Sequence, residues 1–283
     1  MGVLNVTPDS FSDGGQFNSV AAALDHARLL IMGGANIIDV GGESTRPGAT
    51  QVSAQVEQER VLPVIVAIVA ELAATGNQAV QISIDTMNAS TAAAAVAAGA
   101  HIINDVSGGL ADPQMFATAA ATDATLVISH WRGFSNTMDS LAEYQNVALE
   151  VAAELTARVA AAEAAGVDRG KIVIDPGLGF AKDMKQNWQL VARLDELEKL
   201  GLPILVGASR KRFIAATLDA QLQADQGDGA EAGQIGNDRR DLATAVLTAL
   251  LIQRNLWGVR VHNVIATSDA IAMVEALHSA SEK

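Results

Sequence analysis

The feature that most constrains the fold of this chain is a repeated alternation of short apolar, β-branched runs with longer helical patterns. We expect strands at 2–6, 36–40, 80–84, 101–104, 125–129, 171–175, 203–207 and 258–262. Helical patterns fall near 18–32, 54–74, 88–98, 113–121, 143–165, 184–200, 239–254 and 267–279. Strands that alternate with helices without reversal form a parallel sheet, and this many units favour a closed barrel over an open sheet. The sequence therefore predicts an α/β fold, a (β/α)8 TIM barrel.

The length fits one such barrel and no more. The chain has 283 residues, close to the roughly 250 residues that a (β/α)8 domain needs. We expect a single domain over 1–283 in which the polar, Gly- and Ala-rich stretch 219–237 is a flexible surface insertion.

The composition excludes several classes of partner. The net charge is −13, so no basic surface is available for nucleic acid or an anionic membrane. A small anion can still bind where a local group of cations overrides the overall sign. The chain has no Cys, which excludes disulfides and thiolate zinc sites and fits a reducing compartment. No apolar run reaches the roughly 18 residues of a membrane span. We expect a soluble, cytoplasmic protein.

Polar blocks rich in Gly, Pro and charged residues follow the predicted strands. They read LNVTPDSFSDGG (4–15), DVGGESTRPG (39–48), SIDT (83–86), INDVSGG (103–109), DPGLGFAK (175–182), GASRKRF (207–213) and RVHNV (260–264). Active sites of (β/α)8 enzymes lie at the carboxyl ends of the strands. These blocks are therefore the candidate site.

Two of the blocks indicate an anion site. We expect Ser209 to cap the following helix, whose first N–H groups attract anions, and the basic run 210–212 adds positive charge. Arg260 and His262 are two residues apart in a strand, so both side chains lie on one face. An ordinary basic surface turn is the alternative for 210–212.

Carboxylates and amides end three other strands. Asp85, Asn104 and Asp175 suit the N–H groups and mixed edges of a polar heterocycle with a guanidine-like edge. Simple helix capping is the alternative for each of them. Asn5 ends the first strand and is a candidate ligand for Mg²⁺, which often takes few protein oxygens when a substrate phosphate supplies the rest. A turn-forming Asn is the alternative there.

All seven blocks, in this order, resemble the dihydropteroate synthases, folate-pathway enzymes inhibited by sulfonamides. The resemblance covers essentially the whole chain, and LGFAK and HWRG (130–133) are similar to the actinobacterial branch. The resemblance implies a transferase that condenses 6-hydroxymethyl-7,8-dihydropterin diphosphate with 4-aminobenzoate and releases pyrophosphate. It also implies Mg²⁺ as a cofactor and a homodimer, for which 239–254 offers an apolar face.

The resemblance also implies a role for each matching residue. The pterin pocket would be lined by Asp85, Asn104, Asp175 and Lys211, of which Asp85, Asp175 and Lys211 would be catalytic. Mg²⁺ would bind Asn5, and the diphosphate would bind Arg260 and His262. The substrate would be approached by Thr45 and Arg46 as their loop closes. The aminobenzoate pocket would be formed by Phe11, Pro47, Phe180 and Ser209, with the carboxylate at the helix N-terminus behind Ser209.

These roles are consistent with a dissociative substitution. Loss of diphosphate leaves a delocalised cation on the pterin, so the enzyme must stabilise two opposite charges. Asp85 and Asp175 would face the cation, while Lys211, Arg260 and His262 would face the leaving group. A neutral aromatic amine attacks without a strong base, so no covalent enzyme intermediate is expected.

Two positions depart from the family pattern. Ser129 stands where the family commonly has Met, which predicts a modest loss of pterin affinity, on the order of 1 kcal/mol. Asn263 stands where the family has an acid, and if that acid charges His262, diphosphate binding would weaken here. A non-catalytic paralogue that binds pterin or a partner is therefore one alternative. A methyltetrahydrofolate:corrinoid methyltransferase is another, although it needs no diphosphate cradle.

Overall fold

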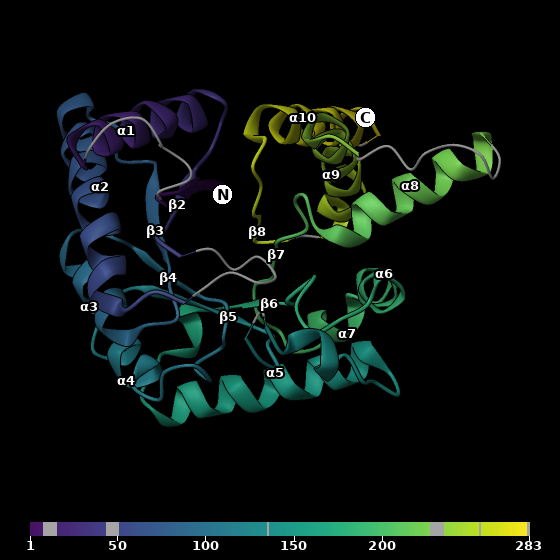
Figure 1. The fold of residues 1–283 in the computed structure, drawn as a ribbon, viewed down its shortest axis with the longest axis horizontal. Helices are drawn as coiled ribbons and strands as arrows, with labels where there is room; N and C mark the ends of the chain where they lie inside the picture. The colour runs from purple at the N-terminus through teal and green to yellow at the C-terminus, as the bar shows by residue number, and fades with distance from the viewer. Residues whose placement is uncertain (8–15, 44–50, 135, 227–234, 255, 282–283) are drawn as a thin grey trace.

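The computed structural model of the chain describes residues 1–7, 16–43, 51–134, 136–226, 235–254 and 256–281 (Figure 1). Its strands are β1 (Gly2–Asn5), β2 (Ile37–Gly41), β3 (Gln81–Asp85), β4 (Ile102–Asp105), β5 (Thr125–Ser129), β6 (Ile172–Asp175), β7 (Leu205–Val206) and β8 (Gly258–Val259). Its α-helices are α1 (Gln16–Met32), α2 (Ala54–Thr75), α3 (Ala89–Ala97), α4 (Met115–Ala120), α5 (Val147–Ala164), α6 (Met184–Ala192), α7 (Asp195–Glu198), α8 (Arg212–Gln226), α9 (Asn237–Leu251) and α10 (Val264–Ser281).

The strands close into a ring, as predicted. β1 to β6 pair in parallel in chain order, and β7 pairs in parallel with β8. Parallel bridges join the two groups: Ile174 pairs with Ile204, and Gly2 pairs with Val261. Because β8 thereby returns to β1, the described strands close on themselves and the (β/α)8 barrel of the sequence prediction is confirmed.

Alternation along each strand separates two layers of side chains. The inner layer includes Ile102, Val127, Val173 and Leu205, which form a small cluster of their own. Their chain neighbours, such as Ile103 and Ile128, belong to the large cluster between the strands and the helices. Since side chains two apart share a face, Asn104 near the end of β4 and Asp175 at the end of β6 fall on the inner face. The strand pattern therefore directs the polar strand ends into the mouth of the barrel.

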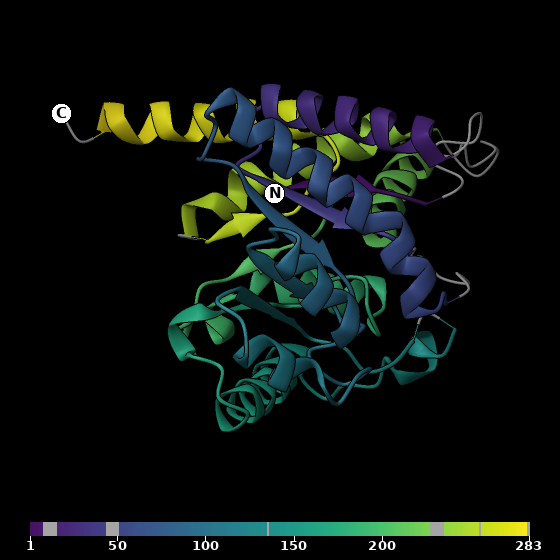
Figure 2. The ribbon, with the colours of Figure 1, turned by 90° about the vertical axis from the view of Figure 1, so that its left-hand side faces the viewer.

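The helices form the outer layer around the strands, and Figure 2 shows α10 running past one side of the barrel. The single helix expected over 184–200 is two helices, α6 and α7, because the backbone leaves the helical region at Arg193 (φ −119°, ψ 39°). Residues 219–226, placed by the sequence in the insertion 219–237, form the last part of α8. Residues 227–234 of that predicted insertion lie outside the described residues.

Candidate active site

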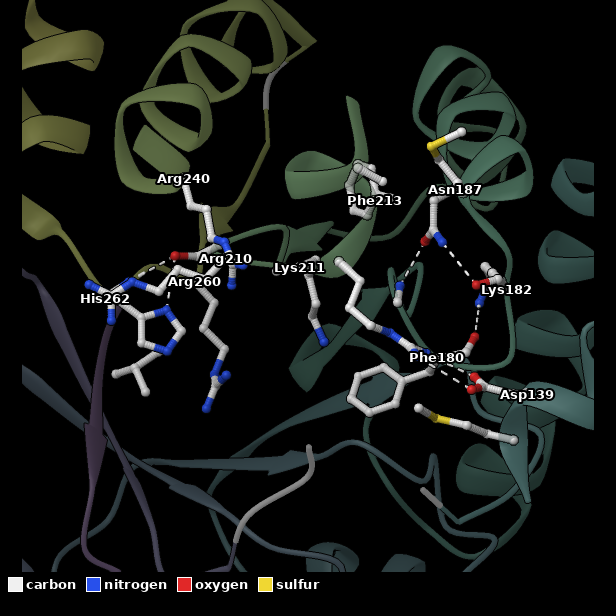
Figure 3. Close-up of a pocket in the computed structure, with 18 of the residues that line it drawn as sticks. Asp139, Phe180, Lys182, Asn187, Arg210, Lys211, Phe213, Arg240, Arg260 and His262 are labelled. Carbon is white, nitrogen blue, oxygen red and sulfur yellow. Dashed lines mark hydrogen bonds and ion pairs between the residues drawn. The ribbon is translucent and has the colours of Figure 1, made fainter. Parts of the chain in front are cut away.

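A cavity of about 990 Å³ lies at the carboxyl ends of the strands, where the sequence placed the chemistry (Figure 3). That volume suits a ligand of the size of a small drug or cofactor. The predicted residues that line it are Asn5, Asp85, Phe180, Ser209, Lys211, Arg260 and His262. Residues from both halves of the barrel therefore meet at one cavity.

An arginine clamped between two carboxylates forms the inner wall. Arg260 donates from Nε to Asp39 Oδ2 (2.6 Å) and from Nη2 to Asp85 Oδ2 (2.7 Å). Asn104 donates its amide to the same Asp39 oxygen (3.2 Å). The Asp39 side chain is fully buried and only 9% of the Asp85 side chain is exposed. Arg260, expected at the diphosphate, thus holds two acids in place.

Burial shifts the ionisation of this wall. It raises the pKa of the Asp85 carboxyl, and the Arg260 guanidinium acts in the opposite direction. Burial would lower the pKa of Arg260, but Asp39 and Asp85 raise it. Burial likewise raises the pKa of Asp175, although a backbone N–H from Gly177 (2.6 Å) opposes the shift. These charges interact strongly because little water screens them.

Lys211 lies against an aromatic ring at the centre of the cavity. Its ammonium nitrogen is 4.0 Å from the centroid of the Phe180 ring, within the range of a cation–π contact. Burial and the nearby Arg260 together lower the pKa of Lys211 to about 8, although Asp175 and Asp85 act in the opposite direction. Figure 3 shows Lys211 between the Arg260 side of the cavity and the Phe180 side. It is therefore placed to contact ligands on both sides.

The two arginines of the run 210–212 have carboxylate partners. Arg210 makes two hydrogen bonds to Asp241 of α9, both 2.7 Å. Arg212 donates to Asp139 at the rim (2.9 Å). The anion site is therefore weaker than the count of basic residues predicts, since these acids offset both arginine charges.

Ser209 joins its block to the last strand instead of capping a helix. Its hydroxyl lies 2.9 Å from His262 Nδ1 and accepts a hydrogen bond from the His262 backbone N–H (3.1 Å). Because α8 begins at Arg212, Ser209 is too far from it to be the N-cap, and the predicted cap is wrong. The two blocks predicted to form the anion site are in contact through this pair.

Asn263 caps the last helix. Its side-chain oxygen accepts a hydrogen bond from the backbone N–H of Ala266, in the first turn of α10. The hypothesis that an acid here would charge His262 loses its support, because this side chain is committed to the helix end. An aspartate would cap α10 equally well.

Several predicted residues lie away from the cavity surface. Asn104 and Asp175 are 2% and 7% exposed and stand directly behind the lining. Ser129 is 3% exposed and pairs in register with Asp175. Four predicted residues lie outside the described residues: Phe11, Thr45, Arg46 and Pro47.

Metal-binding side chains are sparse. Among the described residues, no group of three or more His, Asp or Glu side chains is placed to hold a metal ion. The cavity does offer oxygens from Asn5, Glu43 and Asp85. A metal here would need most of its ligands from a bound phosphate and from water.

Sequence reasoning missed Asp39 and Lys182. Asp39 lies inside the apolar run of β2, and this position was the available signal in the sequence. A carboxylate is stable in such a buried position only when it is paired. Lys182 ends the DPGLGFAK block and is 5% exposed. Its burial could not be read from the sequence, since a terminal lysine in a polar block is usually solvated.

Comparisons with known proteins agree with this geometry. Residues 1–262 match the family described as pterin binding enzyme. The chain is similar to the dihydropteroate synthase of Mycobacterium leprae (strain TN), with 47% identity over 281 residues, 99% of this chain and 93% of that protein. Its fold is similar to that of Xanthomonas albilineans dihydropteroate synthase with 4-aminobenzoic acid (TM-score 0.84, 40% identity, 98% of this chain and 92% of that chain). It is also similar to a Yersinia pestis dihydropteroate synthase with a sulfonamide drug complex (TM-score 0.84, 35% identity, 99% of this chain and 94% of that chain).

Proposed function

This chain belongs to the dihydropteroate synthases, a family of pterin-binding enzymes, and we propose that the cavity described above is where it performs their reaction. The transferase joins 6-hydroxymethyl-7,8-dihydropterin diphosphate to 4-aminobenzoate. The amine nitrogen forms a bond to the methylene carbon of the pterin, and the bond from that carbon to the diphosphate oxygen breaks. The products are 7,8-dihydropteroate, pyrophosphate and one proton from the amine.

The observation that carries the assignment of the site is the distribution of charge in the cavity. Asp85 at the wall and Asp175 behind it supply negative charge, while Lys211 and Arg260 supply positive charge. Departure of the diphosphate creates a pterin cation and an anion at the same moment, and fixed charges of both signs stabilise both. This arrangement supports a dissociative substitution in which the pterin lies over Asp85 and Asp175, with Asn104 behind these two carboxylates.

The aromatic amine fits the Phe180 side of the cavity. The Phe180 ring offers a flat apolar surface next to the Lys211 ammonium. The first N–H groups of α8, which begins at Arg212, would attract the aminobenzoate carboxylate. Ser209 and His262 then face the leaving diphosphate. The Yersinia pestis relative holds a sulfonamide drug, and we infer that sulfonamides compete with 4-aminobenzoate at the Phe180 surface.

Mg²⁺ fits this cavity as an ion that arrives with the diphosphate. The Asn5 amide oxygen at the end of β1 would hold it, with the remaining ligands from phosphate oxygens and water. When bound, the ion would neutralise part of the charge of the leaving group. In this assignment the Lys211 ammonium and the His262 side chain orient the diphosphate.

We propose a homodimer built on α9 and α10. Leu242, Val246 and Leu250 recur at every fourth position of α9, and each is more than half exposed (65%, 55% and 62%). Residues four apart lie on one helix face, so these side chains form an apolar stripe. A second copy of the chain would cover it, and α10 adds exposed Met273 and Leu277. Val246→Glu should shift the protein to the monomer in light scattering, and an unchanged mass would contradict this interface.

None of the helices in the described part of the chain is long and apolar enough to cross a membrane. The cytoplasmic location expected from the composition stays a prediction.

The test is product formation by the purified protein. With the pterin diphosphate, 4-aminobenzoate and Mg²⁺, mass spectrometry should detect dihydropteroate, and Asp85→Ala and Lys211→Ala should abolish it. Lys185→Ala, at an exposed lysine of α6, is the matched control and should keep full activity. Binding of the pterin diphosphate without product formation would favour the non-catalytic paralogue. Binding of the pterin with the same affinity with and without its diphosphate would favour the methyltransferase.

A further inference from the structure

The segment between β6 and α6 has an unusual backbone. Gly177, Gly179 and Ala181 all have positive φ, at 64°, 76° and 46°. Left-handed backbone is unfavourable for alanine, and it recurs here at every second residue. A Cβ at Gly177 would stand 2.0 Å from the carbonyl oxygen of His130, so the segment is pressed against the end of β5. Such a conformation persists only where its surroundings hold it.

Lys182 is the main anchor of this segment. Its buried ammonium nitrogen donates to the carbonyl oxygens of Gly177 and Phe180 (both 3.0 Å) and lies 2.9 Å from His130 Nδ1. These three contacts use all three protons of a lysine ammonium. Asn187 of α6 assists by accepting from the Gly179 backbone N–H (2.7 Å) and donating to the Lys182 carbonyl oxygen (3.1 Å).

The contacts around His130 determine which partner donates the hydrogen bond between Lys182 and His130. Burial and the neighbouring Lys182 lower the pKa of His130 to about 4, so its imidazole is neutral at pH 7. A neutral imidazole that accepts from Lys182 at Nδ1 carries its proton at Nε2, which lies 2.9 Å from Glu154 Oε2. Arg132 also donates to Glu154. Burial lowers the pKa of Lys182 to about 7, while the charge of Asp175 raises it.

The anchored segment carries the aromatic wall of the cavity. Phe180, whose carbonyl oxygen Lys182 binds, is the residue whose ring lies beneath Lys211. A Cβ on Gly179 would stand 2.8 Å from Lys211 Cδ, so the segment also limits where the lysine stem can lie. Figure 3 shows Lys182 and Asn187 on the far side of Phe180 from Arg260 and His262. A shift of the segment would therefore disturb the arylamine side of the cavity more than the diphosphate side.

We propose that Lys182 is a positioning residue that selects the arylamine substrate, by holding Phe180 and thereby the surface on which 4-aminobenzoate rests. The inference rests on the proposed function. Lys182 has no N–H left to contact the substrate and acts through the backbone of the segment.

The test is the effect of Lys182→Met on each substrate separately. The KM for 4-aminobenzoate should rise about tenfold or more, the effect expected for loss of a charge-assisted hydrogen bond, while the KM for the pterin diphosphate should change less than about threefold. Lys185→Met, an exposed lysine of α6 not among the residues that line the cavity, is the control and should change neither. Equal changes in both KM values, or none, would overturn the inference. Wild-type protein that makes no dihydropteroate would instead refute the proposed function.

Chemical rescue distinguishes the effect of losing the Lys182 ammonium from a general disturbance of the fold. Because the chain has no Cys, Lys182→Cys can be alkylated at that one thiol with 2-bromoethylamine in the unfolded state and then refolded, which rebuilds a lysine-like ammonium. The KM for 4-aminobenzoate should return towards the wild-type value. If Lys182→Met does not fold, His130→Gln removes one contact of the ammonium and should raise the same KM about threefold. An unchanged KM in His130→Gln, or no recovery on alkylation, would count against the proposal.

Discussion

Replacing Asp39 tests whether the carboxylate clamp on Arg260 stabilises the barrel. Asp39 Oδ2 accepts from Arg260 Nε at 2.6 Å and from the Asn104 amide at 3.2 Å, in a fully buried position. Removing one partner of a buried ion pair costs about 3–5 kcal/mol. Because Arg260 keeps Asp85 as a partner at 2.7 Å, the lower end, about 3 kcal/mol, is expected for Asp39→Ala.

This loss is large enough to measure by calorimetry. For a domain of this size about 3 kcal/mol corresponds to a fall in melting temperature of roughly 6 °C. Asp39→Asn keeps an acceptor of the same shape and should lose only about 1 kcal/mol, or roughly 2 °C, since the hydrogen bond to Arg260 is no longer charge-assisted. The control is Asp25→Ala, in an exposed pair with Arg28, where no more than about 1 kcal/mol is at stake.

The graded order is the critical result. In differential scanning calorimetry at one scan rate and one protein concentration, the melting temperature of Asp39→Ala should be lower than that of Asp39→Asn. Both should be lower than the melting temperature of the wild type. If Asp39→Ala melts within about 1 °C of Asp25→Ala, the clamp contributes nothing measurable and the reasoning is refuted.

Three further predictions follow from individual groups. Gly177→Ala should destabilise the protein far more than Gly201→Ala, which has a similar φ (65° against 64°) but no atom within 4 Å of a new Cβ; equal melting temperatures would contradict this. The pKa of His130 is lowered from 6.5 to about 4 in the folded protein. As the pH falls from 6.5 to about 4, the unfolded chain is protonated at His130 before the folded protein is. The wild type should therefore lose about 3 kcal/mol of stability over this pH range. Urea unfolding of His130→Gln should not show this pH-dependent loss of stability. A pH dependence identical to that of the wild type would exclude His130 as its source. The kcat/KM for the pterin diphosphate should fall above about pH 8, as Lys211 loses its proton, and Lys211→Arg should remove that limb of the profile; a limb that persists belongs to another group.

Local pattern was sufficient for the architecture and for several of the residues that line the cavity. The predicted strands match the observed ones to within two residues at each end, except the last, which was predicted over 258–262 and is observed over Gly258–Val259. Apolar β-branched runs bounded by polar blocks leave little freedom in where a buried strand begins and ends. Asn5, Asp85 and Arg260 reach the cavity because each stands at the end of a strand, and parallel strands in a barrel end on the same side.

The helix after β7 shows where local pattern was insufficient. Its second half is polar and Gly-poor but leads into the Gly-rich stretch, so 219–226 was assigned to an insertion although it continues α8. Nothing in the local sequence distinguishes a helix end from the start of a loop when both are polar and rich in Ala and Gln. In the structure α8 runs through residues 219–226 without a break, and α8 contacts both α6 and α9.

By itself the sequence determined the barrel, its single chain of βα units and the set of polar residues at its mouth, because strand periodicity and turn composition act over a few residues. Only the tertiary structure decided which of those residues are partners. Arg260 binds Asp39 across 221 residues of sequence, and Lys182 binds His130 across 52. Those pairings depend on closure of the barrel and on the stagger between neighbouring strands. The free energy of a buried charge is set by the atoms that surround it after folding, and no local pattern specifies them.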